Sequence, residues 1–272
     1  MNGKFQKRVQ RYGWDKAADH YEQYWQSQLK PAQDKLLEMA QLRAGDQVLD
    51  TACGTGLVSF RAAEIVAEDG HVLGTDISER MVTMAADAAE ERGIRTATFM
   101  RMDGEQMQLP DESFDVALCS LGLLYYPDPQ LGLREMRRVL RPGGRAVAAV
   151  WGERRNCGWA SIFSIVDERV ESDVCPLFFQ LGTGELLSME FSSAGFTNVV
   201  RKRLSTVLRY DTPDAACGAA FAGGPVALAY ARFDDTTKAE AHAAYLDSIE
   251  RYRRGSGYEI PGEFVIVSGS RN

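Results

Sequence analysis

The 272-residue sequence lacks any apolar run that approaches the roughly 18 residues of a membrane-spanning helix. Residues 1–11 are polar and basic, without the apolar stretch of a secretory signal peptide. The formal net charge of −7 gives no overall basic surface that would favour nucleic acid or an anionic membrane. We therefore expect a cytoplasmic protein with no nucleic-acid partner and no membrane insertion.

Cysteine and histidine are also scarce. No two of the five cysteines have C-x-x-C spacing, and their odd number argues against a complete disulfide framework: Cys53, Cys119, Cys157, Cys175 and Cys217. We expect reduced, buried thiols and no metal site. Among only three histidines, His20 is the most interesting, because it lies beside Tyr21 in an aromatic-rich segment.

The remaining composition is that of an ordinary globular protein, with 45% hydrophobic and 25% charged residues. The length permits one large α/β domain, or a core with a cap. Four arginines share one face of a predicted helix with Glu135, and we interpret that face as solvated surface: Arg134, Arg137, Arg138 and Arg141.

The most informative stretch is residues 48–56, which read Val-Leu-Asp-Thr-Ala-Cys-Gly-Thr-Gly. A short apolar run, a small-residue loop and helical spacing over residues 57–68 predict a strand, a tight turn and a helix. Gly54 and Gly56 allow the backbone to bend sharply and a ligand to approach it. Asp50 places a carboxylate beside the free amides of the helix start.

Two kinds of ligand suit this loop. A dinucleotide favours a third glycine in G-x-G-x-x-G, where this chain has Ser59, and its pyrophosphate would be repelled by Asp50. S-adenosylmethionine carries no phosphate and offers an ammonium and a sulfonium group, which Asp50 would attract. The residues of this loop favour the second ligand and leave the first open.

Further acids follow the next two predicted strands. Asp76 comes 22 residues after Gly54, at the end of strand 70–75, where it can accept hydrogen bonds from both ribose hydroxyls. A plain helix N-cap at Asp76 or Ser78, before helix 79–92, is the alternative. Asp103 follows strand 97–100 and can accept from the adenine amine, unless it is a solvated loop acid.

Together these motifs resemble the class I S-adenosylmethionine-dependent methyltransferases, in particular the ubiquinone/menaquinone C-methyltransferase-like small-molecule branch. The resemblance rests on the glycine-rich stretch 48–56, on Asp103, on the spacing of Trp14 and Tyr21, and on residues 113–151 with their Leu-Arg-Pro-Gly-Gly turn at 140–144. It is strong over residues 14–151 and holds only in outline beyond them. It implies an α/β, Rossmann-like, seven-stranded and mostly parallel sheet with helices on both faces, a helical N-terminal lid and helical cap insertions.

The resemblance also implies a set of site residues. The cofactor would be bound by Tyr21, Asp50, Ala52, Gly54, Gly56, Asp76, Ile77, Met81, Asp103, Gly104, Glu105, Ser120 and Leu121. Candidate catalytic residues, needed only if the acceptor must lose a proton, are His20, Tyr125 and Tyr126. No metal is required for an in-line displacement at the methyl carbon.

We expect a single methyltransferase domain over 1–272. It would comprise a helical lid (1–30), a cofactor-binding core (31–151), cap insertions (152–182 and 209–258) and closing strands (197–208 and 259–268). Helices are predicted over residues 31–42, 57–68, 79–92, 130–140, 157–171 and 183–194, and over 211–254 with a break at 223–225. Strands are predicted over residues 47–51, 70–75, 97–100, 114–119, 145–151, 197–208 and 263–267.

The predicted activity is transfer of a methyl group from S-adenosyl-L-methionine to oxygen, nitrogen or carbon of a small-molecule metabolite, with S-adenosyl-L-homocysteine as the product. Two alternatives stay open at this point: a non-catalytic S-adenosylmethionine-binding regulator and an NAD-dependent oxidoreductase. The expected partner is a small-molecule acceptor, and a homo-oligomer is an open alternative. The motifs do not identify the acceptor, because carbon, nitrogen and oxygen acceptors share this core.

Overall fold

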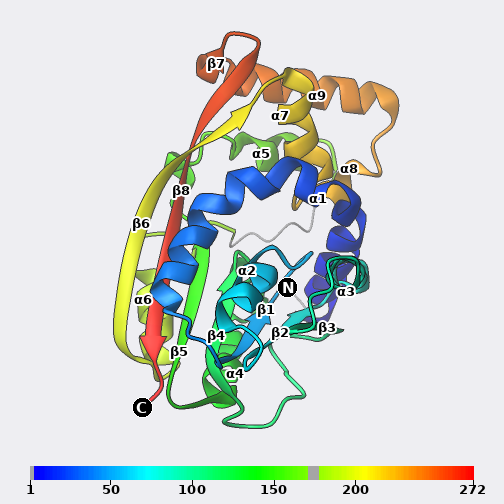
Figure 1. Ribbon diagram of the computed structural model, residues 1–272. Coiled ribbons are helices and arrows are strands. Elements are labelled where there is room, and N and C mark those ends of the chain that lie inside the picture. Colours follow the sequence, from blue (N-terminus) through cyan, green and yellow to red (C-terminus); the bar gives the residue numbers. More distant parts are fainter. Residues whose placement is uncertain (1–2, 171–177) are drawn as a thin grey trace.

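The computed structural model describes residues 3–170 and 178–272, and its centre is one sheet with the strand order β3-β2-β1-β4-β5-β8-β6 (Figure 1). A two-residue strand, β7, pairs with β8 beside this path. The strands are β1 (Gln47–Thr51), β2 (His71–Asp76), β3 (Ala97–Arg101), β4 (Phe114–Ser120), β5 (Leu140–Trp151), β6 (Thr197–Tyr210), β7 (Arg253–Arg254) and β8 (Gly257–Ser270). The prediction of a Rossmann-like, mostly parallel sheet is confirmed, and β7 makes the sheet eight-stranded instead of seven-stranded.

Strands β1 to β5 run parallel, and β8 is antiparallel to both β5 and β6. The central strands are buried on both faces, so Val116 to Leu118 form an uninterrupted apolar run instead of an alternating one. β5 begins at Leu140, earlier than the predicted residue 145, because the Leu-Arg-Pro-Gly-Gly turn pairs irregularly with β4 through a bulge.

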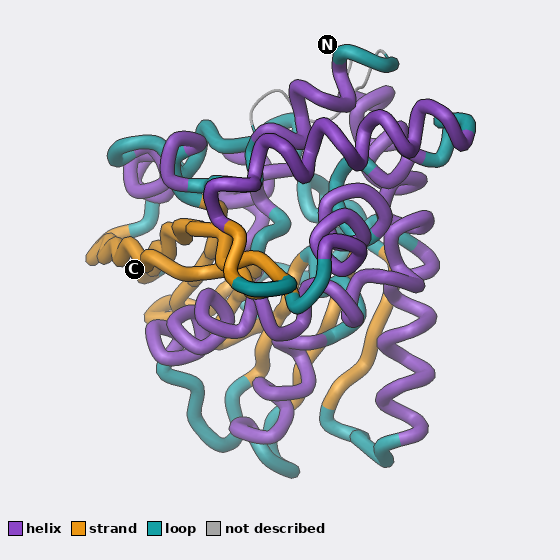
Figure 2. Tube along the Cα trace, turned by 90° about the horizontal axis from the view of Figure 1, so that it is seen from above, coloured by secondary structure: helices purple, strands orange, loops and turns teal. Residues whose placement is uncertain are grey.

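Helices cover both faces of the sheet, as Figure 2 shows from above. α2 (Leu57–Val66) and α3 (Glu79–Glu91) follow β1 and β2, whereas α4 (Pro129–Val139) follows β4 on the other side of the point where the strand order reverses. Because such crossovers are right-handed, α4 lies on the opposite face from α2 and α3. It contacts α6 (Leu186–Ser193), which packs on β6 and β8.

The N-terminal region forms a single helix, α1 (Gly3–Ala40), instead of a lead-in followed by a separate helix starting at Pro31. The prediction of a boundary at Pro31 is wrong. The buried residues Trp25, Leu29, Ala32 and Leu36 continue at helical spacing across the proline, so packing on the sheet outweighs the lost backbone hydrogen bond. Figure 1 shows α1 crossing the sheet from the side of α3 to that of β8.

The region beyond β5 is broken into shorter helices than predicted. α5 (Ser161–Asp167) occupies the middle of predicted helix 157–171. The segment before β8 contains α7 (Pro213–Cys217), a π-helical turn (Gly218–Ala222), α8 (Ala227–Tyr230) and α9 (Asp235–Ile249). The predicted break at 223–225 is confirmed. The proposed cap segment 152–182 includes residues 171–177, which lie outside the described residues.

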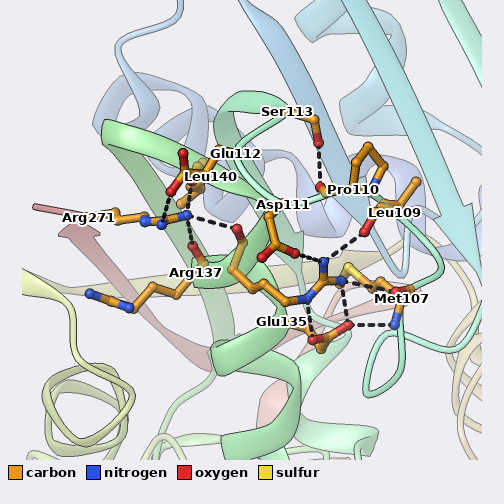
Figure 3. Close-up of polar contacts among 11 residues, drawn as sticks. Met107, Leu109, Pro110, Asp111, Glu112, Ser113, Glu135, Arg137, Leu140 and Arg271 are labelled. Atoms are coloured by element: carbon orange, nitrogen blue, oxygen red, sulfur yellow. Dashed lines mark hydrogen bonds and ion pairs between the residues drawn. The ribbon is translucent and has the colours of Figure 1, made fainter.

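Arg138 is held in a polar network, which corrects the interpretation of its helix face as simply solvated. Figure 3 labels its partners Met107, Leu109, Asp111 and Glu135. Its guanidinium donates to the Met107 and Leu109 carbonyls and to the carboxylates of Asp111 and Glu135. Glu135 in turn accepts from the Met107 amide at 2.7 Å. The network ties the loop between β3 and β4 to α4.

In the described chain, no helix combines the length and hydrophobicity needed to traverse a bilayer.

Candidate active site

One cleft opens at the carboxyl ends of β1, β2 and β4, where the strand order reverses and where open α/β sheets bind ligands. It contains about 900 Å³ of space between protein atoms, including its mouth, which lies in the range of ligand pockets. Twelve of the sixteen predicted site residues line it: Tyr21, Ala52, Gly54, Asp76, Ile77, Met81, Asp103, Glu105, Ser120, Leu121, Tyr125 and Tyr126.

Asp50 lies in a smaller recess that shares Tyr21, Ala52, Gly54 and Ser120 with the cleft. Its Oδ2 accepts from the Ser59 hydroxyl at 2.6 Å, while its Oδ1 is buried without a partner in the described chain. Burial, with a smaller contribution from the charge of Asp76, raises the pKa of Asp50 to about 7. An ammonium group would supply both the missing donor and the missing charge.

Asp76 fixes the glycine loop to the start of α3. One carboxylate oxygen accepts from the Gly54 amide and the other from the Ser78 amide, both at 2.9 Å. Burial raises the pKa of Asp76 despite these bonds. The helix N-cap is Ser78, whose hydroxyl accepts from the Met81 amide, so Asp76 is left to face the cleft.

Asp103 and Glu105 form an acidic rim on the loop after β3. Lys7 of α1 pairs with both carboxylates, at 2.6 Å in each case. Glu105 also accepts from the Asp128 amide at 2.7 Å, which joins this loop to the one after β4. The start of α1 is thereby held beside the predicted adenine position.

α1 also covers the mouth of the cleft further along its length. Trp14 and Tyr21 both line it, with their rings in edge contact at 5.7 Å. Asp15 accepts from the Ser78 hydroxyl at 2.6 Å. These contacts pack the N-terminal half of α1 against the start of α3 at this end of the cleft.

The backbone at this end carries strain at two non-glycine positions. Ala52 has φ +54° and Leu121 has φ +61°, at the ends of adjacent strands β1 and β4. A Cβ on Gly122 would lie 2.2 Å from the Ala52 Cβ, so the two loops approach each other closely. Such strain is typical of sites where main-chain groups must face a ligand.

Four predicted site residues do not line the main cleft: Asp50, which lines the recess, and His20, Gly56 and Gly104. Gly56 caps α2 in a left-handed conformation, and Gly104 leaves room for the Tyr126 hydroxyl, which would lie 1.9 Å from an added Cβ. His20 is exposed on α1 and is not among the residues that line the cleft, so the structure does not bring it together with the other candidate residues. Adjacent helical residues point about 100° apart, which turns His20 away while Tyr21 faces inward.

The two candidate tyrosines differ in their surroundings. The Tyr126 hydroxyl is 2.9 Å from the Thr51 hydroxyl, and burial raises the pKa of this phenol well above its ordinary value. A phenol so placed supports the loop 103–105 and is a poor base. Tyr125 lies between Trp14 and Phe178, with ring centroids 5.2 and 5.5 Å away.

Sequence reasoning missed several lining residues, above all the remaining tryptophans. Trp25, Trp151 and Trp159 line the cleft together with Trp14, which accounts for all four tryptophans of the chain. Lys7 was also missed, and so were Phe178, Gly224 and Pro225. The rarity of tryptophan was the only available signal, because spacing along the chain does not bring these residues together.

The fold and the cleft define a Rossmann-like domain for an adenosine cofactor, and comparison with known proteins narrows the class. A family model described as "Methyltransferase domain" matches residues 48–144. The chain is 34% identical over 165 residues to the ubiquinone/menaquinone biosynthesis C-methyltransferase UbiE of Bdellovibrio bacteriovorus, covering 60% of this chain and 68% of that protein. It therefore belongs to the class I S-adenosylmethionine-dependent methyltransferases of the UbiE-like type.

Other relatives match a shorter part. The nocamycin O-methyltransferase of Saccharothrix syringae is 37% identical over 132 residues, and the demethylmenaquinone methyltransferase of Listeria welshimeri is 32% identical over 128 residues. The alignments cover 48% and 47% of this chain, and 47% and 54% of those proteins, so the chain spans about half the length of each.

Solved structures confirm the fold. YcgJ from Bacillus subtilis superposes with a TM-score of 0.62 at 16% identity, covering 89% of this chain and 99% of that one. Phosphoethanolamine N-methyltransferase 2 of Haemonchus contortus, crystallised with S-adenosyl-L-methionine, gives a TM-score of 0.62 at 15% identity and covers 95% and 57%. The family assignment above, and not these distant structures, makes S-adenosylmethionine the cofactor of this chain.

Proposed function

We propose that this protein transfers the methyl group of S-adenosylmethionine to a small-molecule acceptor. The acceptor would bind at the cap end of the cleft, by which we mean the end lined by Trp25 and Trp159. The observation that carries the proposal is the division of one cleft into two chemically different ends. Asp50, Asp76 and Asp103 gather at the strand tips, whereas Trp25 and Trp159 belong to an aromatic group at the other end.

The cofactor residues have separate tasks in this proposal. Asp50 would pair with the ammonium group, since its Oδ1 is buried and unpaired in the described chain. Asp76 would bind the ribose hydroxyls while holding the Gly54 amide in place. Asp103 would accept from the adenine amine, with Lys7 moderating its charge and that of Glu105.

When bound, S-adenosylmethionine supplies a methyl group on a positively charged sulfur. The protein must hold the acceptor atom at a near-attack distance of roughly 3–3.5 Å and exclude water. Tyr21 and Tyr125, at the junction of the two ends, can stabilise the positive charge through their ring faces by on the order of 0.5–2 kcal/mol. We assign Tyr126 to support of the loop and not to proton transfer.

The names of two relatives indicate which kinds of atom those proteins methylate. One relative is a C-methyltransferase of ubiquinone and menaquinone biosynthesis and another is the nocamycin O-methyltransferase, so carbon and oxygen acceptors both occur among them. We propose that the segments around α5 and α7–α9 cap the acceptor, because Trp159, Gly224 and Pro225 line the cleft. A cytoplasmic location and self-association into a homo-oligomer stay predictions.

Calorimetry with S-adenosylhomocysteine and NAD tests the cofactor assignment, and isotope-labelled S-adenosylmethionine incubated with metabolite extracts tests transfer. We expect micromolar binding of S-adenosylhomocysteine, no binding of NAD, and label in a small molecule. Binding of NAD alone would overturn the cofactor assignment. Cofactor binding without any labelled product would favour the non-catalytic S-adenosylmethionine-binding regulator instead.

A further inference from the structure

Three tryptophans from distant parts of the chain meet at the cap end of the cleft. Trp25 comes from α1, Trp151 ends β5, and Trp159 precedes α5. The ring centroids are 6.0 Å apart for Trp25 and Trp151, 6.1 Å for Trp25 and Trp159, and 4.8 Å for Trp151 and Trp159. Phe178, 5.7 Å from Trp159, connects this tryptophan cluster with Tyr125.

Two members of the tryptophan cluster carry unused hydrogen-bond donors. The indole Nε1 atoms of Trp25 and Trp159 are buried and have no partner in the described chain, and the two residues are only 5% and 4% exposed. The Nε1 of Trp151 is not among these unpaired atoms. A buried tryptophan N–H normally has a partner, because leaving it unpaired is unfavourable. Both residues line the cleft, which makes a ligand bound there the candidate partner of the two N–H groups.

The described residues that line the cap end carry no charge. The other described residues at this end include Leu29, Phe178, Gly224 and Pro225, none of which ionises. The charged lining residues belong to the strand-tip end, where Lys7 pairs with Asp103 and Glu105. A charged methyl acceptor would lose its hydration among these apolar side chains without gaining an oppositely charged partner. The cap end therefore favours an uncharged ligand.

We propose that Trp25 and Trp159 determine acceptor specificity by donating hydrogen bonds to oxygen atoms of an uncharged, flat and largely apolar molecule. The inference rests on the proposed function, since it takes the strand-tip end to be filled by the cofactor. The aromatic walls bind the ring frame of the acceptor, and the two indole N–H groups orient it. A site built to donate to an oxygen discriminates strongly against an analogue that lacks it.

The test compares 1-tetralone, which carries a ring carbonyl, with tetralin, which has the same bicyclic frame and no oxygen. Binding of each is measured by calorimetry to protein saturated with S-adenosylhomocysteine. We expect the wild-type protein to bind 1-tetralone about tenfold more tightly than tetralin. Trp25→Phe and Trp159→Phe should each bring this ratio toward one and leave tetralin affinity within about twofold. Trp151→Phe, the matched control, should keep the wild-type ratio.

Several outcomes would overturn the inference. These are equal affinity for the two compounds in the wild-type protein, no binding of either, or an unchanged ratio in both Trp25→Phe and Trp159→Phe. The affinity for S-adenosylhomocysteine, measured first on every variant, shows that the fold and the cofactor end are intact. If the wild-type protein does not bind S-adenosylhomocysteine, the proposed function itself is contradicted. Failure of the proposed function and failure of this inference are therefore distinguishable.

Discussion

At the strand-tip end of the cleft, the carboxylates come from the last residues of β1 and β2 and from the loop after β3. Asp76 and Asp103 have hydrogen-bond partners on both of their oxygens, and Asp50 has one oxygen bonded and one without a partner in the described chain. At the cap end, aromatic rings come from α1, β5 and the segment before α5. The first end is built by local sequence and the second by tertiary packing. This difference agrees with the proposed function, in which the cofactor binds at the strand tips and the methyl acceptor binds at the cap end.

The largest effect on the strand-tip end is expected from Asp76→Ala. The substitution removes the ribose acceptor and also strands the buried amides of Gly54 and Ser78. We expect S-adenosylhomocysteine affinity to fall by about 2–3 kcal/mol, or roughly 30- to 150-fold, in calorimetry. Asp69→Ala, at an exposed position before β2, is the control and should bind normally. An affinity within twofold of wild type would remove Asp76 from the site.

The support of the strand-tip end can be tested separately from its ligand contacts through Arg138→Ala. This change breaks the bonds to the Met107 and Leu109 carbonyls and leaves Glu135 without its cation. We expect the free energy of unfolding in urea to fall by about 2 kcal/mol, whereas Arg134→Ala on the exposed side of α4 should change it by less than about 0.5 kcal/mol. Equal effects of the two substitutions on the free energy of unfolding would show that the network stabilises the fold no more than an exposed arginine does.

A pH dependence should distinguish the two ends, because only the strand-tip end holds a buried carboxyl that titrates near neutrality. Burial raises the pKa of Asp50 to about 7, so its contribution to stability is present below pH ~4 and is lost as pH rises through ~7. Cofactor binding has the opposite sign, since the ammonium group favours the ionised form. We expect S-adenosylmethionine affinity to be about tenfold weaker at pH 6 than at pH 8.

Asp50→Asn provides the control for this pH dependence. The variant should lack the affinity change between pH 6 and pH 8, and its ligand-free form should melt at a higher temperature than wild type at pH 8. Parallel melting and binding profiles for the two proteins would show that another group titrates. The cap end contributes no such dependence, because its described lining residues do not ionise.

The smallest effect is expected from weakening the attachment of α1 to the loop after β3. Lys7→Ala removes the two ion pairs to Asp103 and Glu105, which are partly exposed and screened by salt. We expect S-adenosylhomocysteine to dissociate about two- to fivefold faster in stopped-flow experiments at low salt, with the difference shrinking at 0.5 M salt. The exposed Lys16→Ala on the same helix should dissociate at the wild-type rate. A difference in dissociation rate that does not change with salt would show that Lys7 does not act through its charge.

The same contrast explains what the sequence could predict. Asp50 and Asp76 lie at the carboxyl ends of apolar strands and Asp103 lies just beyond a third, so their convergence follows from the parallel sheet. The tryptophan cluster joins positions 25, 151 and 159, and no local pattern encodes that meeting. The exposure of His20 could not be predicted, because a helix turns adjacent side chains apart and the phase of α1 against the sheet depends on its packing.

Pro31 shows a related limit. Its local preference to start a helix is genuine, but the buried stripe from Trp25 to Leu36 passes through it without a change of phase. The network of Arg138 could not be predicted either, because its acceptors are main-chain carbonyls of a loop. Tertiary contacts, not composition, decided each of these positions.

The most direct test of the central claim pairs a ligand change with a side-chain change. The affinities of S-adenosylhomocysteine and of its deaminated analogue are measured for the wild-type protein and for Asp50→Asn at pH 8. We predict that wild type prefers S-adenosylhomocysteine by at least about 30-fold, and that Asp50→Asn loses most of that preference, since the ammonium group and Asp50 Oδ1 interact. An equal preference in both proteins would contradict the account, because it would mean that the buried carboxylate does not bind the cofactor.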